Sequence, residues 1–234
     1  MPVHIRFSLG PARSADDRSV SLAIKSAASS ALDRFKTTGH IDAMPRASTR
    51  DRILVAGRDV IHRHGFSASG VAEITAAAGV PKGSFYNHFE SKEAFACAAL
   101  DSYWEQGGPA CTLLSGSRPP TDRVREHFKV LDRLVSADSY AAGCMLGNFA
   151  IEAGPLSETL RKHVAALLAR WTSQLAACLE EGQTAGSISA ALPAETLARF
   201  LIAAWHGAVQ RAKVERNGRA TAAFHRTLTV LLAP

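Results

Sequence analysis

The sequence predicts an all-α protein in which an N-terminal three-helix helix-turn-helix domain is joined to a larger helical domain. From about residue 49 onward, apolar residues recur at helical spacing, and glycines and prolines divide the chain into segments of helical length. No stretch alternates apolar and polar residues over a useful strand length, and we find no internal repeat. With 234 residues and 47% hydrophobic content, the chain is long enough for one large domain or two small ones.

The charge and the cysteines narrow the class of protein. Twenty-seven basic and 21 acidic residues give a net charge of +6, which fits a nucleic-acid partner but is weak evidence by itself. The cysteines, at positions 97, 111, 144 and 178, lack the spacing of a zinc site, so we expect no metal, no cofactor and a reduced, cytoplasmic setting. No apolar run approaches the roughly 20 residues that span a bilayer, so we expect no membrane association and no export.

Residues 1–45 form an extension rich in Ser, Ala and Arg, for which three interpretations stay open. Val20, Ile24 and Leu32 belong to a set at helical spacing, which would suit an amphipathic helix or an arm that touches DNA. The composition also suits a disordered tail. Alternatively, the physiological start is Met44, which leads almost directly into the first helix.

The first two helices are predicted from their caps and stops. The first begins at about Thr49, with Ser48 or Thr49 as its cap, and stops at Gly65. Its inward stripe consists of Ile53, Ala56, Val60 and Ile61. The second opens at Ser69 and ends near Ala78, although Gly70 is a poor helix former. Gly79 then supplies the tight turn between two nearly perpendicular helices.

The third helix is short and presents a polar, basic outer face. Pro81 suits its first position, where no backbone donor is needed. Phe85 and Phe89 should point inward together with Val80. That orientation leaves the following side chains outward or toward the edges: Lys82, Ser84, Tyr86, Asn87 and His88. Such a surface suits phosphates and base edges, so this is the expected DNA-reading helix.

Residues from about Thr49 to Lys92 resemble the N-terminal domain of the TetR family of transcriptional repressors. The resemblance rests on the Gly65-Phe66 turn, Ala78-Gly79-Val80, the run Lys82-Gly83-Ser84-Phe85-Tyr86, His88-Phe89 and Ser91-Lys92-Glu93. Thr75 departs from the small apolar residue that is usual after Ile74. The resemblance implies a repressor without enzymatic activity that binds a palindromic operator in double-stranded DNA as a homodimer.

The resemblance also assigns DNA contacts. It implies phosphate contacts by Ser69, Lys82, Tyr86, His88 and Lys92, and base contacts at Gly83, Ser84 and Asn87. The chemistry agrees, because Lys82 and Lys92 are point charges suited to phosphate and Gly83 allows the backbone to approach closely. Asn87 suits an adenine edge but equally a cap or a solvent-facing position. A lone histidine such as His88 is more often a surface residue than a specific reader.

Helical segments continue to the end of the chain. Ser91 should cap a helix that runs to the break at Gly107-Gly108-Pro109. Beyond it, the pattern predicts helices at about 121–137, 144–152, 156–182, 193–215 and 219–232. We therefore divide the chain into an extension at 1–45, a DNA-binding domain at 46–92, and a ligand-sensing and dimerisation domain at 93–234.

The last two expected helices carry broad apolar faces, with more apolar surface than one small domain needs on a single side. The family resemblance implies that they pair with their two-fold mates as a four-helix bundle. The alternative is that both faces belong to the core of one chain.

The segment Gly143-Cys144-Met145-Leu146-Gly147-Asn148 resembles the regulatory domain of the N-ethylmaleimide-responsive and acrylate-responsive repressors within the TetR family. That resemblance implies a sensor of electrophiles or oxidants, with Cys144, Asn148, Trp205 and Lys213 as the expected sensing residues. A thiol at a helix start feels the positive end of the helix dipole, which favours the reactive thiolate, and a nearby lysine would lower the thiol pKa. The alternative for Cys144 is a buried structural thiol.

Three functional hypotheses follow. The leading one is a repressor released when a small electrophile or oxidant modifies Cys144. The second is release by a non-covalent hydrophobic ligand, in a pocket that Trp104, Phe149, Trp171 and Trp205 could line. The third is an enzyme with an accessory DNA-binding domain, yet no nucleophile elbow or nucleotide-binding loop accompanies Cys144 and the histidines. The remaining cysteines, Cys97, Cys111 and Cys178, are expected to be packing residues.

Overall fold

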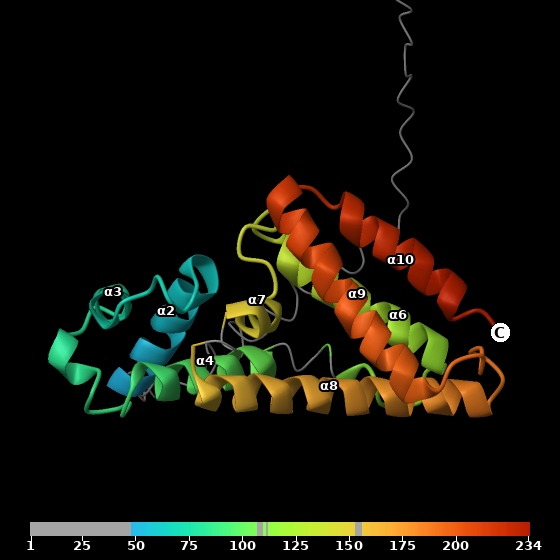
Figure 1. Ribbon diagram of the computed structural model, residues 1–234, viewed down its shortest axis with the longest axis horizontal. Helices are drawn as coiled ribbons and strands as arrows, with labels where there is room; N and C mark the ends of the chain where they lie inside the picture. The colour runs from blue at the N-terminus through green and yellow to red at the C-terminus, as the bar shows by residue number, and fades with distance from the viewer. Residues whose placement is uncertain (1–47, 107–109, 111, 153–155) are drawn as a thin grey trace, which may run out of the picture. The chain divides into compact units, whose positions relative to one another are not determined.

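The computed structural model describes residues 48–106, 110, 112–152 and 156–234, and within these ranges it contains helices and no β-strand. The DNA-binding part comprises α2 (Thr49–His64), α3 (Val71–Ala77), the 3₁₀ helix η1 (Lys82–Ser84) and α4 (Lys92–Gln106). We include α4, which lies beyond the domain boundary at 92 used above, because its Phe95 packs against Phe85 and Phe89. The regulatory part comprises α6 (Pro120–Ser136), α7 (Met145–Glu152), α8 (Glu158–Thr184), α9 (Ala194–Glu215) and α10 (Arg219–Leu231) (Figure 1). The all-α prediction is confirmed. The extension at 1–45, the break at 107–109 and Cys111 lie outside the described residues.

The helix boundaries follow local signals in the sequence. Ser48 caps α2 by accepting a hydrogen bond from the backbone N–H of Asp51 at 3.1 Å. Gly65 ends α2 with a φ of 89°, a conformation that other residues rarely adopt. Ser91 likewise accepts a hydrogen bond from the N–H of Ala94 at 3.0 Å, at the start of α4. In the regulatory part, every helix begins and ends within two residues of the predicted position.

The helix α3 is shorter than predicted. It begins at Val71 with Gly70 as its N-cap, so the prediction that Ser69 opens it is wrong. The Ser69 hydroxyl instead donates a hydrogen bond to the carbonyl of Gly65 at 2.7 Å, which closes the turn that follows α2. The buried Thr75 satisfies its hydroxyl within α3, by donating to the carbonyl of Val71 at 2.9 Å.

The expected DNA-reading helix, residues 82–89, is here called the reading element, and it is a 3₁₀ helix followed by a turn and not a regular helix. The backbone N–H groups of Ser84, Phe85 and His88 each donate to the carbonyl three residues earlier, as in a 3₁₀ helix. A segment this short has too few residues to offset the cost of starting an α-helix, and Gly83 in its middle is a poor helix former. Its conformation therefore depends on packing against the rest of the DNA-binding part.

A cluster of phenylalanines forms the core of the DNA-binding part. The ring centroids of Phe85, Phe89 and Phe95 lie 5.1 to 5.5 Å apart, and the inward orientation predicted for Phe85 and Phe89 is confirmed. Helix α2 reaches this core through Gly57. A Cβ at that position would lie 2.5 Å from Cγ2 of Ile74 and 2.6 Å from Cζ of Phe95, so only glycine allows so close an approach.

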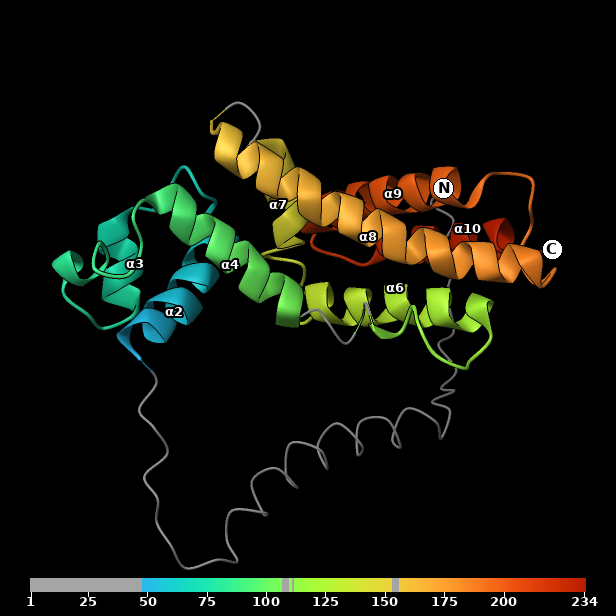
Figure 2. The same ribbon diagram turned by 90° about the horizontal axis from the view of Figure 1, so that it is seen from below.

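The regulatory helices pack around a second aromatic core. Helix α6 packs against α8 and α10, and α9 packs against the same two helices (Figures 1 and 2). The rings of Phe128, Trp205 and Phe224 join α6, α9 and α10, with centroid distances of 4.8 to 5.7 Å. The short helix α7 contacts both α8 and α4, so it connects the regulatory part to the DNA-binding part.

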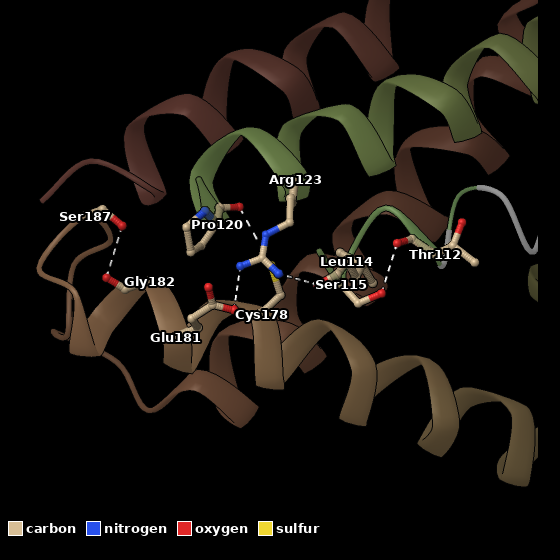
Figure 3. A network of polar contacts seen from close by, with 9 residues as sticks. All are labelled: Thr112, Leu114, Ser115, Pro120, Arg123, Cys178, Glu181, Gly182 and Ser187. Atoms are coloured by element: carbon tan, nitrogen blue, oxygen red, sulfur yellow. Dashed lines mark hydrogen bonds and ion pairs between the residues drawn. The ribbon is translucent and has the colours of Figure 1, made fainter. Parts of the chain in front are cut away.

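A buried arginine fixes α6 against α8 (Figure 3). Arg123 is 2% exposed, and its guanidinium donates to the carbonyl of Leu114 at 3.0 Å and pairs with the carboxylate of Glu181. Beside it, the thiol of Cys178 donates to the carbonyl of Pro120 at 3.7 Å, which fits the packing role predicted for this cysteine. Because a buried guanidinium without partners would be strongly destabilising, these contacts hold the two helices in register.

Candidate DNA interface and sensing pocket

Arg52 of α2 positions the turn before the reading element. Its Nη2 donates to the carbonyls of Ala78 and Gly79, at 2.8 and 3.0 Å. Gly79 itself has a φ of 63°, in the left-handed region that glycine adopts without strain. The direction in which η1 leaves α3 is therefore fixed by a side chain of α2 and by the glycine.

The outward face of the reading element is accessible. Lys82, Gly83, Asn87 and His88 are exposed, and Ser84 is half-buried. Tyr86 is 60% exposed, although its ring packs edge-on against Phe85 with a centroid distance of 5.3 Å. An ammonium group, an amide, an imidazole and a hydroxyl thus lie together on a surface that phosphates and base edges can reach.

Two of the residues expected at phosphates have other partners in the structure. Ser69 is fully buried and its hydroxyl donates to the carbonyl of Gly65, so in this conformation the hydroxyl is used within the protein. The ammonium of Lys92 lies 4.3 Å from the ring centroid of Phe66, a cation–π contact. Lys92 is half-buried and stands at the first position of α4.

Cys144 lies at the end of the loop between α6 and α7. The carboxylate of Asp138 accepts hydrogen bonds from the loop backbone, including the N–H of Ala142 at 3.0 Å. The side-chain amide of Asn148 reaches back from α7 and donates to the carbonyl of Ala142 at 2.9 Å. Gly143 has a φ of 72°, which turns the chain into α7. The loop is therefore held by its own Asp138 and by Asn148 of α7, and Cys144 immediately precedes α7.

Cys144 is a buried thiol and not a resting thiolate. Its side chain is 8% exposed, and its carbonyl accepts the N–H of Asn148 at 2.9 Å, as at a helix start. Burial raises the pKa of the Cys144 thiol, while the N–H groups of Gly147 and Leu146 and the hydroxyl of Tyr103 act in the opposite direction. The expectation that the helix start favours the thiolate is wrong in its net sign, because desolvation outweighs these hydrogen bonds.

Cys144 forms part of the wall of a cavity of about 200 Å³. The wall includes His62 from α2 and Tyr103 and Trp104 from α4, together with Trp171 from α8 and Trp205 from α9. Three of the four aromatic residues proposed for a pocket therefore line it. Helices α2 and α4 belong to the DNA-binding part, so the cavity lies where both parts of the chain contribute side chains.

The two histidines in the cavity wall are hydrogen-bonded, His127 through both ring nitrogens and His62 through Nε2. His127 donates from Nδ1 to the carbonyl of Ala110 at 2.7 Å, and its Nε2 accepts a hydrogen bond from the indole N–H of Trp171 at 3.0 Å. Burial lowers the pKa of His127 to about 4, so the ring is neutral at neutral pH. His62 donates from Nε2 to the carbonyl of Gly143 at 2.9 Å, and burial lowers its pKa as well.

Helix α7 is bound to the DNA-binding part at both of its ends. Before its first residue, the carbonyl of Gly143 accepts the hydrogen bond of His62. At its last residue, the carboxylate of Glu152 accepts hydrogen bonds from the backbone N–H groups of Phe66 and Ser67, at 2.9 and 2.6 Å. Burial by itself would raise the pKa of Glu152, but these N–H groups and the charge of Lys92 lower it.

The other expected sensing residues have distinct surroundings. The stem of Lys213 packs against the loop, with Cδ 3.3 Å from the place that a Cβ on Gly143 would take. Burial and, to a smaller extent, the charge of Lys213 lower the pKa of His62. Trp205 belongs to both the cavity wall and the aromatic core. Phe149, which was expected near a pocket, packs against Phe66 with a centroid distance of 6.1 Å.

The sequence alone did not identify His62, Tyr103 and His127 as pocket residues. Helical phase marks Tyr103 and His127 as inward-facing, which is a signal of burial and not of a cavity. His62 lies in the polar last turn of α2, and its partner Gly143 follows 81 residues later. No local pattern connects positions so far apart.

Comparison with known proteins gives the family. Residues 53–99 match the family model described as bacterial regulatory proteins, tetR family, and residues 120–228 match the tetracyclin repressor-like C-terminal domain. The chain is 41% identical over 176 residues to the HTH-type transcriptional repressor DhaR of Mycobacterium sp. (strain GP1), which covers 74% of this chain and 87% of that protein. The chain belongs to the TetR family.

Two further relatives support the resemblance of this TetR-family repressor to the N-ethylmaleimide-responsive and acrylate-responsive repressors. The transcriptional regulator AcuR of Cereibacter sphaeroides is 32% identical over 186 residues, covering 78% of this chain and 85% of AcuR. The crystal structure of Escherichia coli NemR in its reduced form superposes with a TM-score of 0.71 at 28% identity, covering 80% of this chain and 98% of that one. The predicted likeness to both is confirmed.

The relatives are transcriptional regulators, so this chain is a transcriptional repressor and not an enzyme. The enzyme hypothesis would need a histidine as a base beside Cys144. The candidates His163 and His206 do not line the cavity with Cys144. Across the described ranges, no helix is long and apolar enough to cross a membrane. Among the same residues, no group of three or more His, Cys, Asp and Glu side chains is placed to hold a metal ion.

Proposed function

We propose that this TetR-family repressor binds a palindromic operator as a homodimer and releases it when a small electrophile or oxidant modifies Cys144. The position of Cys144 carries the proposal, because the thiol lies in the wall of a cavity that α2 and α4 also line. A group added to the sulfur therefore meets side chains of the DNA-binding part directly.

The operator contact in this proposal uses the accessible face of the reading element. Phosphates are contacted by Lys82, Tyr86, His88 and Lys92, and base edges by Gly83, Ser84 and Asn87. Gly83 supports the assignment, since a Cβ at this position would meet nothing within 4 Å. The fold does not require glycine there, whereas close approach of the backbone to a DNA groove does benefit from it.

The dimer contact in this proposal is the outer face of α9 and α10. On α9, Phe200 and Val214 are 52% and 84% exposed, and Gly207, seven residues from each, is exposed between them. On α10, Val230 is 73% exposed. Large exposed apolar side chains on neighbouring helices indicate a protein interface. A second copy of the chain is the fitting partner, because two-fold symmetry places two reading elements on a palindrome.

The chemistry at Cys144 is addition at sulfur. With an α,β-unsaturated carbonyl compound, the sulfur bonds to the β-carbon and the thiol proton ends on the α-carbon. With a peroxide, the thiol becomes a sulfenic acid and the peroxide is reduced to an alcohol or water. Because burial disfavours the resting thiolate, the N–H groups of α7 and the hydroxyl of Tyr103 matter when negative charge develops on the sulfur.

Release requires the modified protein to be less stable in its DNA-binding conformation than in another one. The contacts at the two ends of α7 supply the route, since an adduct beside Gly143 competes for the space and the hydrogen bond of His62. Loss of that contact changes how the C-terminal turn of α2 is held. Couplings of this kind are typically about 1 to 3 kcal/mol, or roughly 5- to 150-fold in affinity.

The cavity also favours a second candidate function, which is release by a small hydrophobic ligand that binds without a covalent bond. The cavity of about 200 Å³ is present while Cys144 is unmodified, and aromatic and aliphatic side chains make up most of its wall. Such cavities bind small apolar molecules. In this case the thiol would be one wall residue among several.

Anisotropy titration of labelled DNA from upstream of the protein's own gene, before and after a mild thiol alkylator, tests the proposal. We expect the wild type to lose affinity after alkylation and Cys144→Ser to keep it. Cys97→Ser is the matched control, because Cys97 is the half-buried free thiol on α4, and it should respond as the wild type does. Release of Cys144→Ser by the alkylator would contradict covalent sensing. Its release by an unreactive apolar compound would support the second candidate.

A further inference from the structure

We propose that the cavity beside Cys144 admits small, uncharged electrophiles and excludes anionic ones of the same size. The inference rests on the proposed function and specifies the chemical class that reaches the sulfur. Its first observation is the composition of the wall, since among the described residues no Asp, Glu, Lys or Arg lines the cavity. A carboxylate or phosphate entering it would leave water without meeting an opposite charge.

The two histidines of the wall offer little compensation to an anion. Both ring nitrogens of His127 are hydrogen-bonded, one to the carbonyl of Ala110 and the other to the indole N–H of Trp171. The indole N–H of Trp171 is therefore not free to bind an anion. The N–H of His62 is bound to the carbonyl of Gly143. Burial keeps both imidazoles neutral, so neither acts as a cation toward a ligand. An anion that breaks these hydrogen bonds would also leave buried acceptors without donors.

The charged side chains that act on His62 and Tyr103 are of both signs. The fields of Lys213, Asp138 and Asp59 all reach His62. Arg58, whose charge acts on Tyr103, is paired with Asp59 at 3.2 Å. Asp138 and Asp59 therefore offset the charges of Lys213 and Arg58. A third cation, the exposed Arg170, lies 5.6 Å from the ring centroid of the wall residue Trp104, where water screens its charge. A negative charge on the ligand would also oppose the negative charge that develops on the sulfur during the reaction.

The size of the cavity limits the ligand further. Its volume is about 200 Å³, and an apolar cavity of about 150 Å³ holds benzene. The cavity can therefore hold a reagent up to a size somewhat larger than benzene. Leu134 belongs to the wall and is 55% exposed, so it marks the side on which the cavity meets solvent.

Iodoacetamide and iodoacetate test the inference, because they share size and leaving group and differ in charge. In each reaction the Sγ–carbon bond forms as the carbon–iodine bond breaks, iodide departs and the thiol proton passes to solvent. The rate at Cys144 of the full-length protein is followed by peptide mass spectrometry and divided by the rate of a free cysteine derivative under the same conditions. We expect the normalised rate with iodoacetamide to exceed that with iodoacetate by about tenfold or more.

A pair of variants isolates the charge effect. Leu134→Arg places a cation at the solvent side of the cavity and should raise the normalised iodoacetate rate by roughly fivefold over Leu134→Gln, which has no charge. Equal normalised rates for the two reagents in the wild type would overturn the inference, and so would absence of alkylation at Cys144 by either. If iodoacetamide alkylates Cys144 selectively and the protein still binds its operator, the inference about charge holds and the proposed function is wrong.

Discussion

The imidazole Nε2 of His62 donates a hydrogen bond to the carbonyl oxygen of Gly143 at 2.9 Å. His62 lies in the last turn of the DNA-binding helix α2, and Gly143 directly precedes Cys144. The residue next to the proposed sensing thiol is thus bound by the helix that positions the turn before the reading element. A change at Cys144 therefore has a short physical route to the DNA-binding part.

Replacing His62 tests that route. We expect the operator affinity of unmodified His62→Ala to lie within about threefold of the wild-type affinity. The factor by which alkylation weakens operator binding should be roughly fivefold smaller in His62→Ala than in the wild type, because one hydrogen bond contributes about 1 kcal/mol. Anisotropy titrations with and without alkylation measure both quantities. His64→Ala is the control, since His64 lies in the same turn but pairs with Glu73 at an exposed site. An undiminished response in His62→Ala would show that the contact carries no coupling.

The contact at the other end of α7 predicts a stability effect. Glu152→Gln should lower the free energy of unfolding by about 1 kcal/mol, because the carboxylate that accepts the N–H groups of Phe66 and Ser67 loses its charge at a partly exposed site. Urea unfolding followed by circular dichroism measures the change. Glu158→Gln, which removes exposed ion pairs with Arg161 and Lys162, should differ little from the wild type. If both variants were equally stable, the Glu152 contact would be energetically unimportant.

Lys92 predicts a change in salt dependence. If its ammonium neutralises a DNA phosphate, Lys92→Ala should reduce the slope of log affinity against log salt by about one unit and weaken binding to all sequences alike. Operator titrations over a range of salt concentrations measure the slope. Lys129→Ala, which removes an exposed lysine of α6, should leave the slope as in the wild type. An unchanged slope in Lys92→Ala would restrict this lysine to its contact with the ring of Phe66.

His127 predicts acid sensitivity of the fold. Burial lowers its pKa from 6.5 to about 4, so the unfolded chain takes up this proton at a higher pH than the folded chain. The stability that results is complete above about pH 6.5 and is lost as the pH falls toward 4, a change of about 3 kcal/mol. Urea unfolding at a series of pH values should therefore show a shallower pH dependence for His127→Gln than for His64→Gln, whose side chain is exposed. Parallel curves for the two variants would contradict the shift. His206, whose pKa is also lowered to about 4, is retained in both variants.

Gly207 predicts the position of the dimer contact. A Cβ added at Gly207 would meet no atom within 4 Å beyond the adjacent residues and the backbone of its own helix, and position 207 is exposed. Gly207→Leu should therefore fold, since leucine is also the better helix former. On the proposed interface, however, the added bulk should weaken dimerisation by about tenfold or more and reduce operator affinity with it. Sedimentation velocity measures the dimer directly. Ala166→Leu, at an exposed position of α8, is the control and should remain dimeric. If the Gly207→Leu dimer were as stable as the wild-type dimer, the dimer contact would not include Gly207.

Local chemistry in the sequence determined most of the helical framework. Ser48 and Ser91 cap helices because a serine hydroxyl satisfies an unpaired N–H group, and Gly65 and Gly79 turn the chain because they adopt positive φ values without strain. Phe85 and Phe89 face the core as their apolar character and spacing predicted. These signals act over a few residues, so the sequence alone was sufficient to find the family resemblance and the outward face of the reading element.

Only the tertiary structure decided the properties that depend on distant segments or on exclusion of water. The reading element forms a 3₁₀ helix, and Ser69 is buried in a turn, because packing outweighs local preference at both places. The helix start favours a Cys144 thiolate, yet burial by other helices raises the thiol pKa. The contact between His62 and Gly143 joins positions 81 residues apart. Periodicity tells which side of a helix is buried, but a cavity and its electrostatics arise only when several such sides meet.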